Sequence, residues 1–502
     1  MSGSASKRLC AVCAAVAAAM LTVVGGAAGT VTPPVVASGP SPFTACTADN
    51  PTAQEQFSTL YPNAEPEPRA AINPTDSSNI VGYFQQDRWD NGGDRGLVVS
   101  VSHNGGASWV AAPMPGITKC SNGAYDRASD PWVSFAPNGD VYAITLSFDV
   151  FDPNNAVLVS KSTNGGDTWS DPIAVAADAT NGLDKESITA DPHDSNYVYA
   201  MWDRFVSPPG FPRSDNGRFH ARSFVQQAWF SRTTNGGLSW ETPHVAFNPG
   251  TQAGTIGSII NVLPDRTLVD GLVVFSVHKQ SSTQLRGASV AVIRSTDLGE
   301  TWSKKPSIVA PFDPTFGGPT DPDTGHPIRS GGLPDFTVDP QNGNLYAVWE
   351  DDAPTKGVDA IQFSQSTDGG LTWSSPIKIN QTPTDIPAGD RQAFTPTVKV
   401  AATGTVGVTY YDFRNNTADP GLTTDYWFVS CASDCADASS WGAEQHVAGP
   451  FDEEQAADAG GYFLGDYEGM VTTGNTFGPF FVQAESRAAN NPSDVFYTTV
   501  TP

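Results

Sequence analysis

Acidic, basic and aromatic residues of the 502-residue chain recur at two kinds of position, directly after one apolar segment and directly before another. Asp87-Arg88 and Asp203-Arg204 follow apolar segments, and Asp390-Arg391 precedes one. Carboxylates and guanidinium groups bind polar ligands through charge-assisted hydrogen bonds, and carboxyls also act as acids and bases in hydrolysis. The repetition equally suits ion pairs that connect neighbouring elements, and we expect that structural use for the first two pairs.

Several other kinds of chemistry find no support in the sequence. There is no Gly-x-Ser-x-Gly segment and no phosphate-binding glycine-rich loop, and the seven histidines lack the spacing of a zinc site. The formal net charge of -26 would repel a nucleic-acid backbone, so no nucleic-acid partner is expected. No metal or cofactor is expected at the site, although a structural calcium ion is conceivable at the acidic turn 321–325.

An octapeptide with the pattern Ser/Thr-x-Asp/Asn-x-Gly-x-Ser/Thr-Trp recurs between the secondary-structure elements that position these residues. Its five copies span residues 102–109, 162–169, 233–240, 295–302 and 366–373. The Asp or Asn side chain accepts hydrogen bonds from nearby backbone N–H groups, and the Gly supplies a positive φ. We therefore predict five similar hairpin turns, each followed by a packed Trp.

Four short strands surround each copy, and their order predicts the architecture. With 48 Gly and 40 Pro, long helices are excluded and many short strands are expected. Four strands per unit of about 60–70 residues is the pattern of a propeller blade. We predict an all-β chain that forms a single β-propeller, of seven blades by count with six as the alternative. The octapeptide turns share one face, and the ionisable loops share the opposite face.

The first 37 residues are predicted to be a secretory signal peptide, with Lys7-Arg8, an apolar run and then small residues. Cleavage after Ala28 and cleavage after Ala37 both fit. Residues 38–64 form an N-terminal segment that could close the last blade, and residues 65–502 form the propeller. No later apolar run reaches the length of a membrane span.

Four cysteines follow the signal peptide, which suggests two disulfides in an oxidising compartment. Cys431 and Cys435 are close enough in sequence to bond across a tight loop, and they stand where the sixth unit lacks the octapeptide. Cys46 would then pair with Cys120.

The octapeptide resembles the Asp-box, or BNR repeat, of sialidases and related β-propellers, and the resemblance covers roughly residues 65–502. It implies catalytic and substrate-binding residues by position. Arg69 stands where sialidases carry their first arginine, although the surrounding motif is absent, and Asp87-Arg88 resembles a later segment of the same blade. Asp94 resembles the acid/base residue, with Asp90 as a rival. Tyr467 resembles the tyrosine nucleophile.

The remaining positions agree less well with the sialidase pattern. Asp335 lies where the family has a catalytic Glu, and we expect it to act as the base for Tyr467. The second arginine of the family has no counterpart, because Glu350 and Asp351 stand there, while Arg391 or Arg414 could be the third.

The resemblance thus implies an exo-glycosidase that removes terminal sugars, sialic acid among them, from a glycan. The signal peptide implies that it is secreted, and we expect a monomer. Arg69, Arg88, Arg391 and Arg414 would bind substrate, and Trp89 would stack on a sugar ring. Two alternatives stay open: a propeller that binds glycans or surfaces without catalysis, and a glycan-cleaving enzyme of another specificity, such as a lyase.

Overall fold

The computed structural model describes Met1 and residues 29–206, 225–278, 281–312 and 318–502. These residues form an almost entirely β structure, in which the one α-helix is the short α1 (Pro51–Gln54). No helix in the described part of the chain has the length and apolar character needed to cross a membrane. Most of the predicted signal peptide lies in residues 2–28, outside the described residues.

The strands follow one another in antiparallel units, as the all-β prediction requires. The first three units contain these strands: β4 (Arg69–Asn73), β5 (Asp76–Trp89), β6 (Asp94–Ser102) and β7 (Val110–Pro113); β8 (Arg127–Phe135), β9 (Val141–Phe148), β10 (Asn155–Ser162) and β11 (Ile173–Asp178); β12 (Gly182–Ala190), β13 (Val198–Val206), β14 (Val225–Thr233) and β15 (His244–Phe247).

The later units repeat the pattern. Their strands are: β16 (Ala253–Val262), β17 (Leu268–His278), β18 (Ser281–Ser295) and β19 (Ser307–Phe312); β20 (Asp335–Val338), β21 (Leu345–Asp351), β22 (Ala360–Ser366) and β23 (Ile377–Lys378); β24 (Ala393–Val400), β25 (Val406–Asp412), β26 (Thr423–Cys431) and β27 (Gln445–Asp452); and, in the last unit, β30 (Gly469–Thr473), β31 (Thr476–Ser486) and β32 (Asn491–Tyr497).

The remaining elements are short: β3 (Leu60–Tyr61) pairs with β5, and β28 (Ala457–Asp458) pairs with β29 (Tyr462–Phe463). Single 3-10 turns are η1 (Lys119–Ser121), η3 (Gly389–Arg391), η4 (Ala438–Ser440), η5 (Glu453–Gln455) and η6 (Arg487–Ala489).

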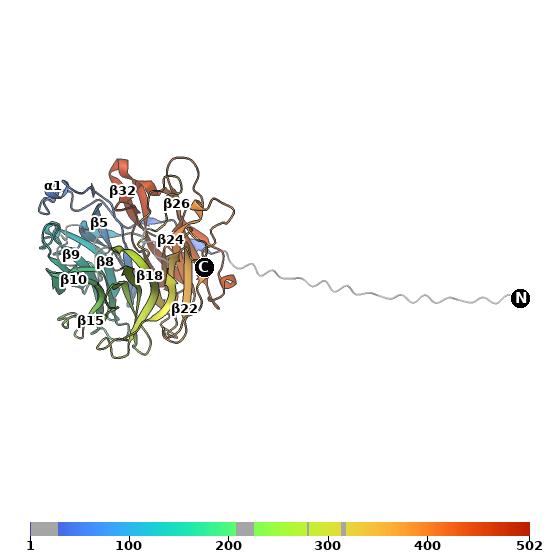
Figure 1. The fold of residues 1–502 in the computed structure, drawn as a ribbon, viewed down its shortest axis with the longest axis horizontal. Helices are drawn as coiled ribbons and strands as arrows, with labels where there is room; N and C mark the ends of the chain where they lie inside the picture. The colour runs from blue at the N-terminus through green and yellow to red at the C-terminus, as the bar shows by residue number, and fades with distance from the viewer. Residues whose placement is uncertain (2–28, 207–224, 279–280, 313–317) are drawn as a thin grey trace.

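The first strands of the units form a closed ring. Each contacts the next in chain order, from β4 through β8, β12, β16, β20 and β24 to β30, and β30 contacts β4. Figure 1 shows the same order around the molecule, from the blue β5 through the green β10 and β18 to the red β32. This arrangement is the predicted β-propeller, with the first strands innermost.

Two hydrogen bonds recur in all five copies of the octapeptide turn, one from the fifth-position Gly N–H to the first Ser/Thr hydroxyl and one from the seventh-position Ser/Thr N–H to the Asp/Asn side chain. In the copy at residues 162–169, Gly166 N–H donates to Ser162 Oγ at 3.0 Å, and Thr168 N–H donates to Asn164 Oδ1 at 3.1 Å. Gly166 has a φ of 98°, which a residue with a Cβ adopts only at a cost. In the sixth unit, the Cys431–Cys435 disulfide closes the turn instead, and Trp441 Nε1–H donates to Cys435 O at 3.0 Å.

The N-terminal segment completes the last unit. β2 (Val35–Val36) pairs with β32, while β1 (Thr30–Val31) pairs with β33 (Val500–Thr501). Ala37 is fully buried, and its N–H donates to Val495 O at 2.8 Å. The strand that completes the unit therefore precedes residues 38–64.

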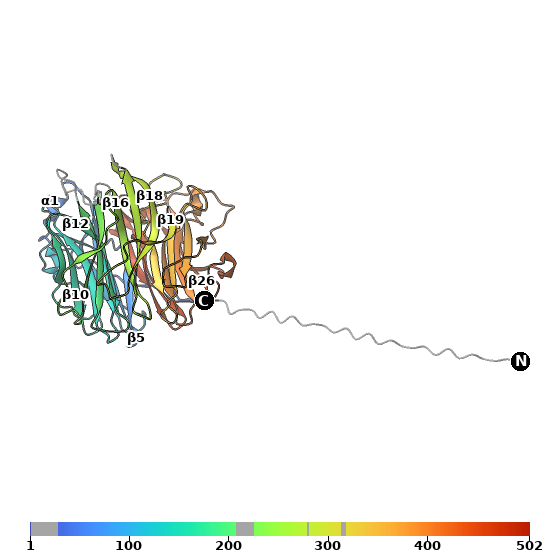
Figure 2. The same cartoon turned by 60° about the horizontal axis from the view of Figure 1, so that its bottom comes forward.

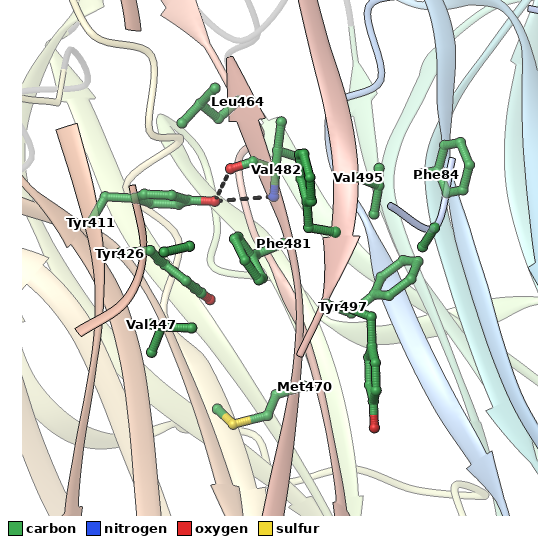
Figure 3. Close-up of a cluster of buried hydrophobic side chains, with 14 of the residues drawn as sticks. Phe84, Tyr411, Tyr426, Val447, Leu464, Met470, Phe481, Val482, Val495 and Tyr497 are labelled. Atoms are coloured by element: carbon green, nitrogen blue, oxygen red, sulfur yellow. Dashed lines mark hydrogen bonds between the residues drawn. The ribbon is translucent and has the colours of Figure 1, made fainter. Parts of the chain in front are cut away.

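Large aromatic side chains fill the space between the last two units (Figure 3). The Tyr411 hydroxyl donates to Val482 O at 2.7 Å and accepts from Val482 N–H at 3.1 Å, which ties β25 to β31. The rings of Tyr426 and Phe481 stack with their centroids 4.5 Å apart. The junction between the last two units is thus stabilised by burial of apolar side chains and by the Tyr411 hydroxyl, whose hydrogen bonds are satisfied.

We predict that signal cleavage leaves residues 29–37 on the mature protein. Cleavage after Ala28 keeps β1, β2 and the buried Ala37, whereas cleavage after Ala37 removes all three. Mass spectrometry of the secreted protein should therefore give Gly29 as the first residue. A mature chain that starts at Ser38 would contradict this prediction.

We predict that Asn164→Ala lowers the free energy of unfolding by about 1 kcal/mol or more, because the Thr168 N–H loses its acceptor. The substitution lies between a third and a fourth strand, on the face opposite the loops that join second and third strands. Affinity for a ligand of that opposite face should therefore be unchanged in the folded variant. Urea unfolding and a binding titration measure the two effects, and lost binding without lost stability would refute the assignment of faces.

Candidate active site

The innermost strands share a backbone irregularity on the face opposite the octapeptide turns. Near the start of four first strands, two residues oppose one residue of the second strand, and the first of the two has a positive φ. These residues are Asp130 (53°), Lys185 (48°), Gly257 (77°) and Thr395 (47°). Glu67 (56°) occupies the same position before β4, since Pro66 O accepts from Gln85 N–H while Arg69 is paired with Tyr83. We call these residues the bulge positions.

Charged residues at bulge positions carry a conformational cost that glycine avoids. A left-handed backbone costs a residue with a Cβ about 1 kcal/mol or more, and such strain concentrates at functional sites. Bulges also turn a side chain away from the regular alternation of a strand. Glu67, Asp130 and Lys185 come from three successive units, and the bulges bring their charged ends together.

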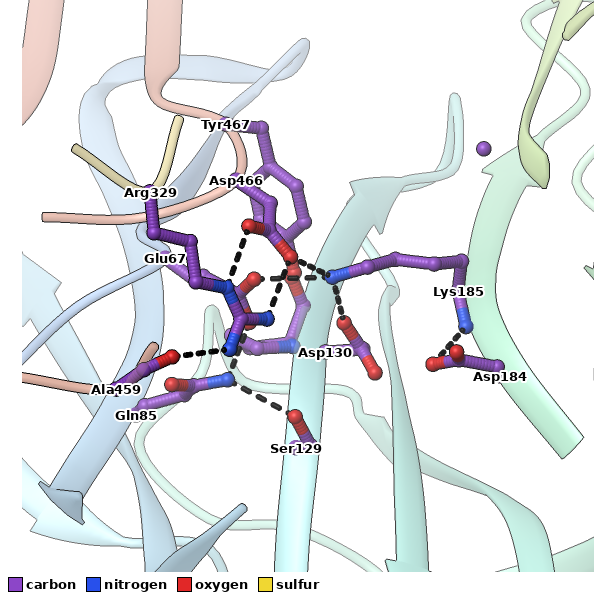
Figure 4. Close-up of polar contacts among 12 residues, drawn as sticks. Glu67, Gln85, Ser129, Asp130, Asp184, Lys185, Arg329, Ala459, Asp466 and Tyr467 are labelled. Atoms are coloured by element: carbon purple, nitrogen blue, oxygen red, sulfur yellow. Dashed lines mark hydrogen bonds and ion pairs between the residues drawn. The ribbon is translucent and has the colours of Figure 1, made fainter. Parts of the chain in front are cut away.

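The ammonium of Lys185 lies at the centre of this group (Figure 4). Its Nζ is 3.0 Å from Glu67 Oε1, 2.6 Å from Asp130 Oδ1 and 2.6 Å from Asp466 Oδ2. Asp466 precedes β30 and also pairs with Arg329, whose Nε and Nη2 donate to its two oxygens at 3.2 and 3.1 Å. We call these five residues the lysine cluster.

Burial and charge move the pKa values of the cluster in opposite directions. Burial raises the pKa of Glu67 to about 8 despite the nearby Lys185. Burial also raises the pKa of Asp130, against the attraction of Lys185. Burial alone would raise the pKa of Asp466 as well, but Arg329 and Lys185 hold it well below its usual range. Near neutral pH the cluster therefore contains both a protonated and an ionised carboxyl, which is the combination used in acid–base catalysis.

A cavity of about 130 Å³ opens beside the cluster. Asp130, Lys185 and Arg329 lie on its wall, together with Arg88 and Asp184. Further wall residues come from the loop between β9 and β10 and from the segment before β12. The apolar part of the wall consists of Leu146 and Phe148 of β9, Leu183 of β12 and Phe205 of β13. The cavity thus lies on the face that the sequence assigned to the ionisable loops.

A second cavity, of about 20 Å³, contains three of the residues implied by the family resemblance. Arg69, Asp335 and Tyr467 all lie on its wall, and Arg69 Nη2 is 3.2 Å from Asp335 Oδ1. The Tyr467 hydroxyl donates to Pro131 O at 3.2 Å, and burial raises its pKa well above the usual range. Asp335 therefore pairs with Arg69 rather than with the Tyr467 hydroxyl.

Asp94, the residue implied as the acid, is fully buried and pairs with Arg88 at 3.3 Å. Burial raises its pKa to about 7. Arg88 Nη1 also donates to Gln85 Oε1 at 3.1 Å, and Gln85 Nε2 contacts Glu67, so Asp94 is connected to the lysine cluster through two side chains. Asp90, its rival, is half-buried, and its N–H donates to Thr59 O at 2.9 Å.

The other implied substrate-binding residues lie on the wall of neither cavity. Trp89 is fully buried beneath Arg127, whose guanidinium carbon is 4.5 Å from the ring centroid, so its ring is closed to a ligand. Arg391 Nε donates to Ile386 O at 2.7 Å. Arg414 pairs with Asp412 at 2.6 Å and with Glu444 at 2.5 Å. These contacts give each residue a structural role.

The acidic turn at residues 321–325 satisfies its first carboxylate internally. Asp321 Oδ1 accepts from the N–H groups of Asp323 and Thr324 at 2.8 and 3.2 Å. Calcium binding at this turn stays a prediction.

The sequence contained a signal for part of the lysine cluster. Glu67 and Asp130 open the first strands of their units, and Lys185 lies in the equivalent ionisable segment before the third. Alignment of the strand openings would have selected these positions. Asp466 lies in the corresponding ionisable segment before the last first strand, whereas Arg329 occupies no repeated position, so only the fold shows that Arg329 belongs to the cluster.

No family model and no curated protein matches the sequence. Among solved structures, a Hadza microbial sialidase is 15% identical with a TM-score of 0.42, over 84% of this chain and 76% of that chain. The Penicillium chrysogenum alpha-L-arabinanase complexed with arabinobiose is 12% identical with a TM-score of 0.45, over 76% and 94%. A mutant of NanB sialidase from Streptococcus pneumoniae is 11% identical with a TM-score of 0.43, over 88% and 94%. The likeness is one of fold.

We predict that Lys185→Met lowers the free energy of unfolding by about 3–5 kcal/mol near pH 8, because three buried carboxyls lose their shared cation. The loss should be smaller near pH 5. Without the ammonium, burial leaves Glu67 and Asp130 with a higher pKa in the folded chain than in the unfolded chain, while Arg329 still holds the pKa of Asp466 low. The contribution of Glu67 and Asp130 to stability is then complete below their unfolded pKa values and is lost as the pH rises through their folded pKa values.

Lys119→Met is the matched control for this measurement. Lys119 contacts Asp126 at 2.5 Å, but 37% of its side chain is exposed, so its loss should cost about 1 kcal/mol or less. Urea unfolding of both variants at the two pH values gives the comparison. An Lys185→Met protein with the same loss at both pH values would contradict the account of the cluster.

Proposed function

We propose that this protein is a secreted glycoside hydrolase that removes a terminal sugar from a glycan in the cavity beside the lysine cluster. The observation that carries the proposal is a pair of carboxyls on the cavity wall, Asp130 and Asp184, one of which is buried and has a raised pKa. Hydrolysis of a glycosidic bond needs a protonated and an ionised carboxyl on the two sides of the bond.

In the proposed reaction, Asp130 gives its proton to the glycosidic oxygen as the bond to the sugar carbon breaks. A water molecule attacks that carbon, and Asp184 takes the proton that the water loses. The burial that raises the pKa of Asp130 keeps the carboxyl protonated at a higher pH than an exposed aspartate. Activity should therefore fall as the pH rises through the pKa of Asp130.

The size and charge of the cavity indicate which substrate it can hold. About 130 Å³ is well below the volume of pockets that hold drug-sized ligands, which favours one sugar ring and an exo-acting enzyme. The charged groups among the described wall residues are three cations and four carboxyls: Arg88, Lys185 and Arg329, and Asp130, Asp149, Asp152 and Asp184. Each of these cations already contacts a carboxyl. This balance favours a neutral sugar over sialic acid.

A binding protein without catalytic activity is the second candidate, and the resting contacts of Tyr467 favour it over a sialidase mechanism. The hydroxyl that would act as nucleophile is engaged with Pro131 O, and the carboxyl expected to act as its base is held by Arg69. The reaction with Asp130 and Asp184 uses neither residue as a reactant, so Tyr467→Phe distinguishes the two mechanisms. A collapse of sialoside cleavage in Tyr467→Phe would support the sialidase mechanism and overturn ours.

We predict that Asp130→Asn lowers kcat by about 100-fold or more, because the proton donor is lost. The test uses aryl glycosides of sialic acid and of arabinofuranose, together with arabinan and ulvan, and measures released phenol or reducing ends. Asp171→Asn is the matched control, since it removes the same charge from an exposed residue on the face of the octapeptide turns, and its kcat should stay within about threefold of wild type.

Three results would contradict the proposal. The folded wild type could fail to cleave every compound of the set, which would leave the binding function. Asp130→Asn could retain full activity, which would place the acid elsewhere. An unsaturated product from ulvan would indicate a lyase.

A further inference from the structure

Two exposed phenylalanine side chains meet at the rim of the cavity. The ring of Phe57 is 5.6 Å from the ring of Phe151, with the planes at 83°. Their exposed fractions are 50% and 56%, and no other aromatic residue is among the exposed large hydrophobic residues of the described chain. Single exposed apolar residues are common on proteins, but two aromatic rings from distant segments that meet in water are not.

The segment that carries Phe57 is fixed to the propeller by several strong contacts. The Cys46–Cys120 disulfide joins it to η1. Arg95 pairs with Asp49 at 2.8 Å, and Arg127 Nε donates to Gln54 Oε1 at 2.6 Å. Both arginines are buried. In Figure 2, helix α1 of this segment lies at the upper left of the molecule, while β5 is labelled at the lower end.

The loop that carries Phe151 is also internally bonded. Asp149 N–H donates to Asn154 O at 2.9 Å, and Asn154 Nδ2 donates back to Asp149 Oδ2 at 3.1 Å. Val150 N–H donates to Asp126 Oδ2 at 3.0 Å, and the Val150 side chain is buried. The two rings therefore stand on ordered supports, which lowers the entropy cost of binding a ligand against them.

The ring pair is continuous with the cavity. Asp149 and Asp152, on either side of Phe151, lie on the cavity wall. On the other side, Arg127 contacts the Gly92 carbonyl, and Gly92 lies on the same wall. Arg127 Nη2 also donates to Ser58 Oγ at 3.3 Å, directly after Phe57. Phe57 and Phe151 therefore lie next to residues of the cavity wall, within reach of a chain that leaves the cavity on this side.

We infer that Phe57 and Phe151 form a stacking subsite for a neutral sugar ring of the glycan, outside the cavity that takes the terminal ring. This inference rests on the proposed function, because it places the glycan in that cavity. One face of a sugar ring presents C–H groups, which pack on an aromatic ring, while its hydroxyl groups stay at the edge. The exposed carboxylate of Asp152 lies beside the rings and can accept hydrogen bonds from those hydroxyls.

The size of the Phe57–Phe151 ring pair and the charge of the chain argue against a protein or a nucleic acid as the ligand. A stable protein interface buries about 800 Å² on each side, far more than two half-exposed phenyl rings provide. A nucleic-acid base could also stack on such rings, but the net charge of -26 would repel its phosphates. A sugar ring has the size of the patch and carries no charge.

The test measures binding rather than turnover. Native gels that contain arabinan, ulvan or sialylated mucin show binding as retardation, and titration of the polysaccharide gives Kd. We expect the wild type to be retarded by at least one polysaccharide, and Phe57→Ala and Phe151→Ala each to raise that Kd roughly five- to tenfold. Phe151→Tyr keeps the ring and should keep the wild-type Kd. Leu238→Ala is the matched control, because Leu238 is 82% exposed in an octapeptide turn on the opposite face.

The outcomes separate this inference from the proposed function. Wild-type retardation without any cleavage would refute the hydrolase but leave the subsite. Cleavage of an aryl glycoside together with an unchanged polysaccharide Kd in both folded Ala variants would refute the subsite alone. The subsite is also refuted if no polysaccharide retards the wild type, or if Leu238→Ala weakens binding as much as Phe151→Ala.

Discussion

The ammonium of Lys185, held between three buried carboxyls, connects parts of the chain that are far apart in sequence. Glu67 comes from the first unit, Asp130 from the second, Lys185 from the third and Asp466 from the last. Arg329 adds a contact from the segment before β20. Several buried charges in one place are costly unless their charges and hydrogen bonds balance, so these contacts have to form together. The same balance fixes which carboxyls are protonated beside the cavity.

The two faces of the propeller have different tasks in this account. Each octapeptide turn satisfies its own backbone groups with its own Ser/Thr and Asp/Asn side chains, and its Trp packs nearby, so that face can be repeated from unit to unit without change. The opposite face is not repetitive, because each bulge position carries a different residue: Glu67, Asp130, Lys185, Gly257 and Thr395. The backbone irregularity is common to the units, while the chemistry is specific to each of them.

The sequence was sufficient to predict the fold, but it was not sufficient to predict much of the candidate site. The octapeptide predicted its turns because every bond in it is local, and the spacing of Cys431 and Cys435 predicted their disulfide for the same reason. Arg69, Asp335 and Tyr467, which the resemblance to sialidases implied, are neighbours in the fold, but their pairing depends on side-chain directions that no spacing reveals. Trp89 was expected at the surface, yet it lies beneath Arg127. The position of Lys185 could have been found by aligning the strand openings, but its left-handed φ has no sequence signature, since strand pairing imposes it.

The most direct test of the lysine cluster as the functional centre is a crystal structure of Asp130→Asn with a bound glycan that the wild type cleaves. The account predicts a terminal sugar ring in the cavity of about 130 Å³, with its glycosidic oxygen in hydrogen-bond distance of residue 130 and the next ring over Phe57 and Phe151. A glycan bound on the face of the octapeptide turns, or beside Arg391 and Arg414, would contradict it.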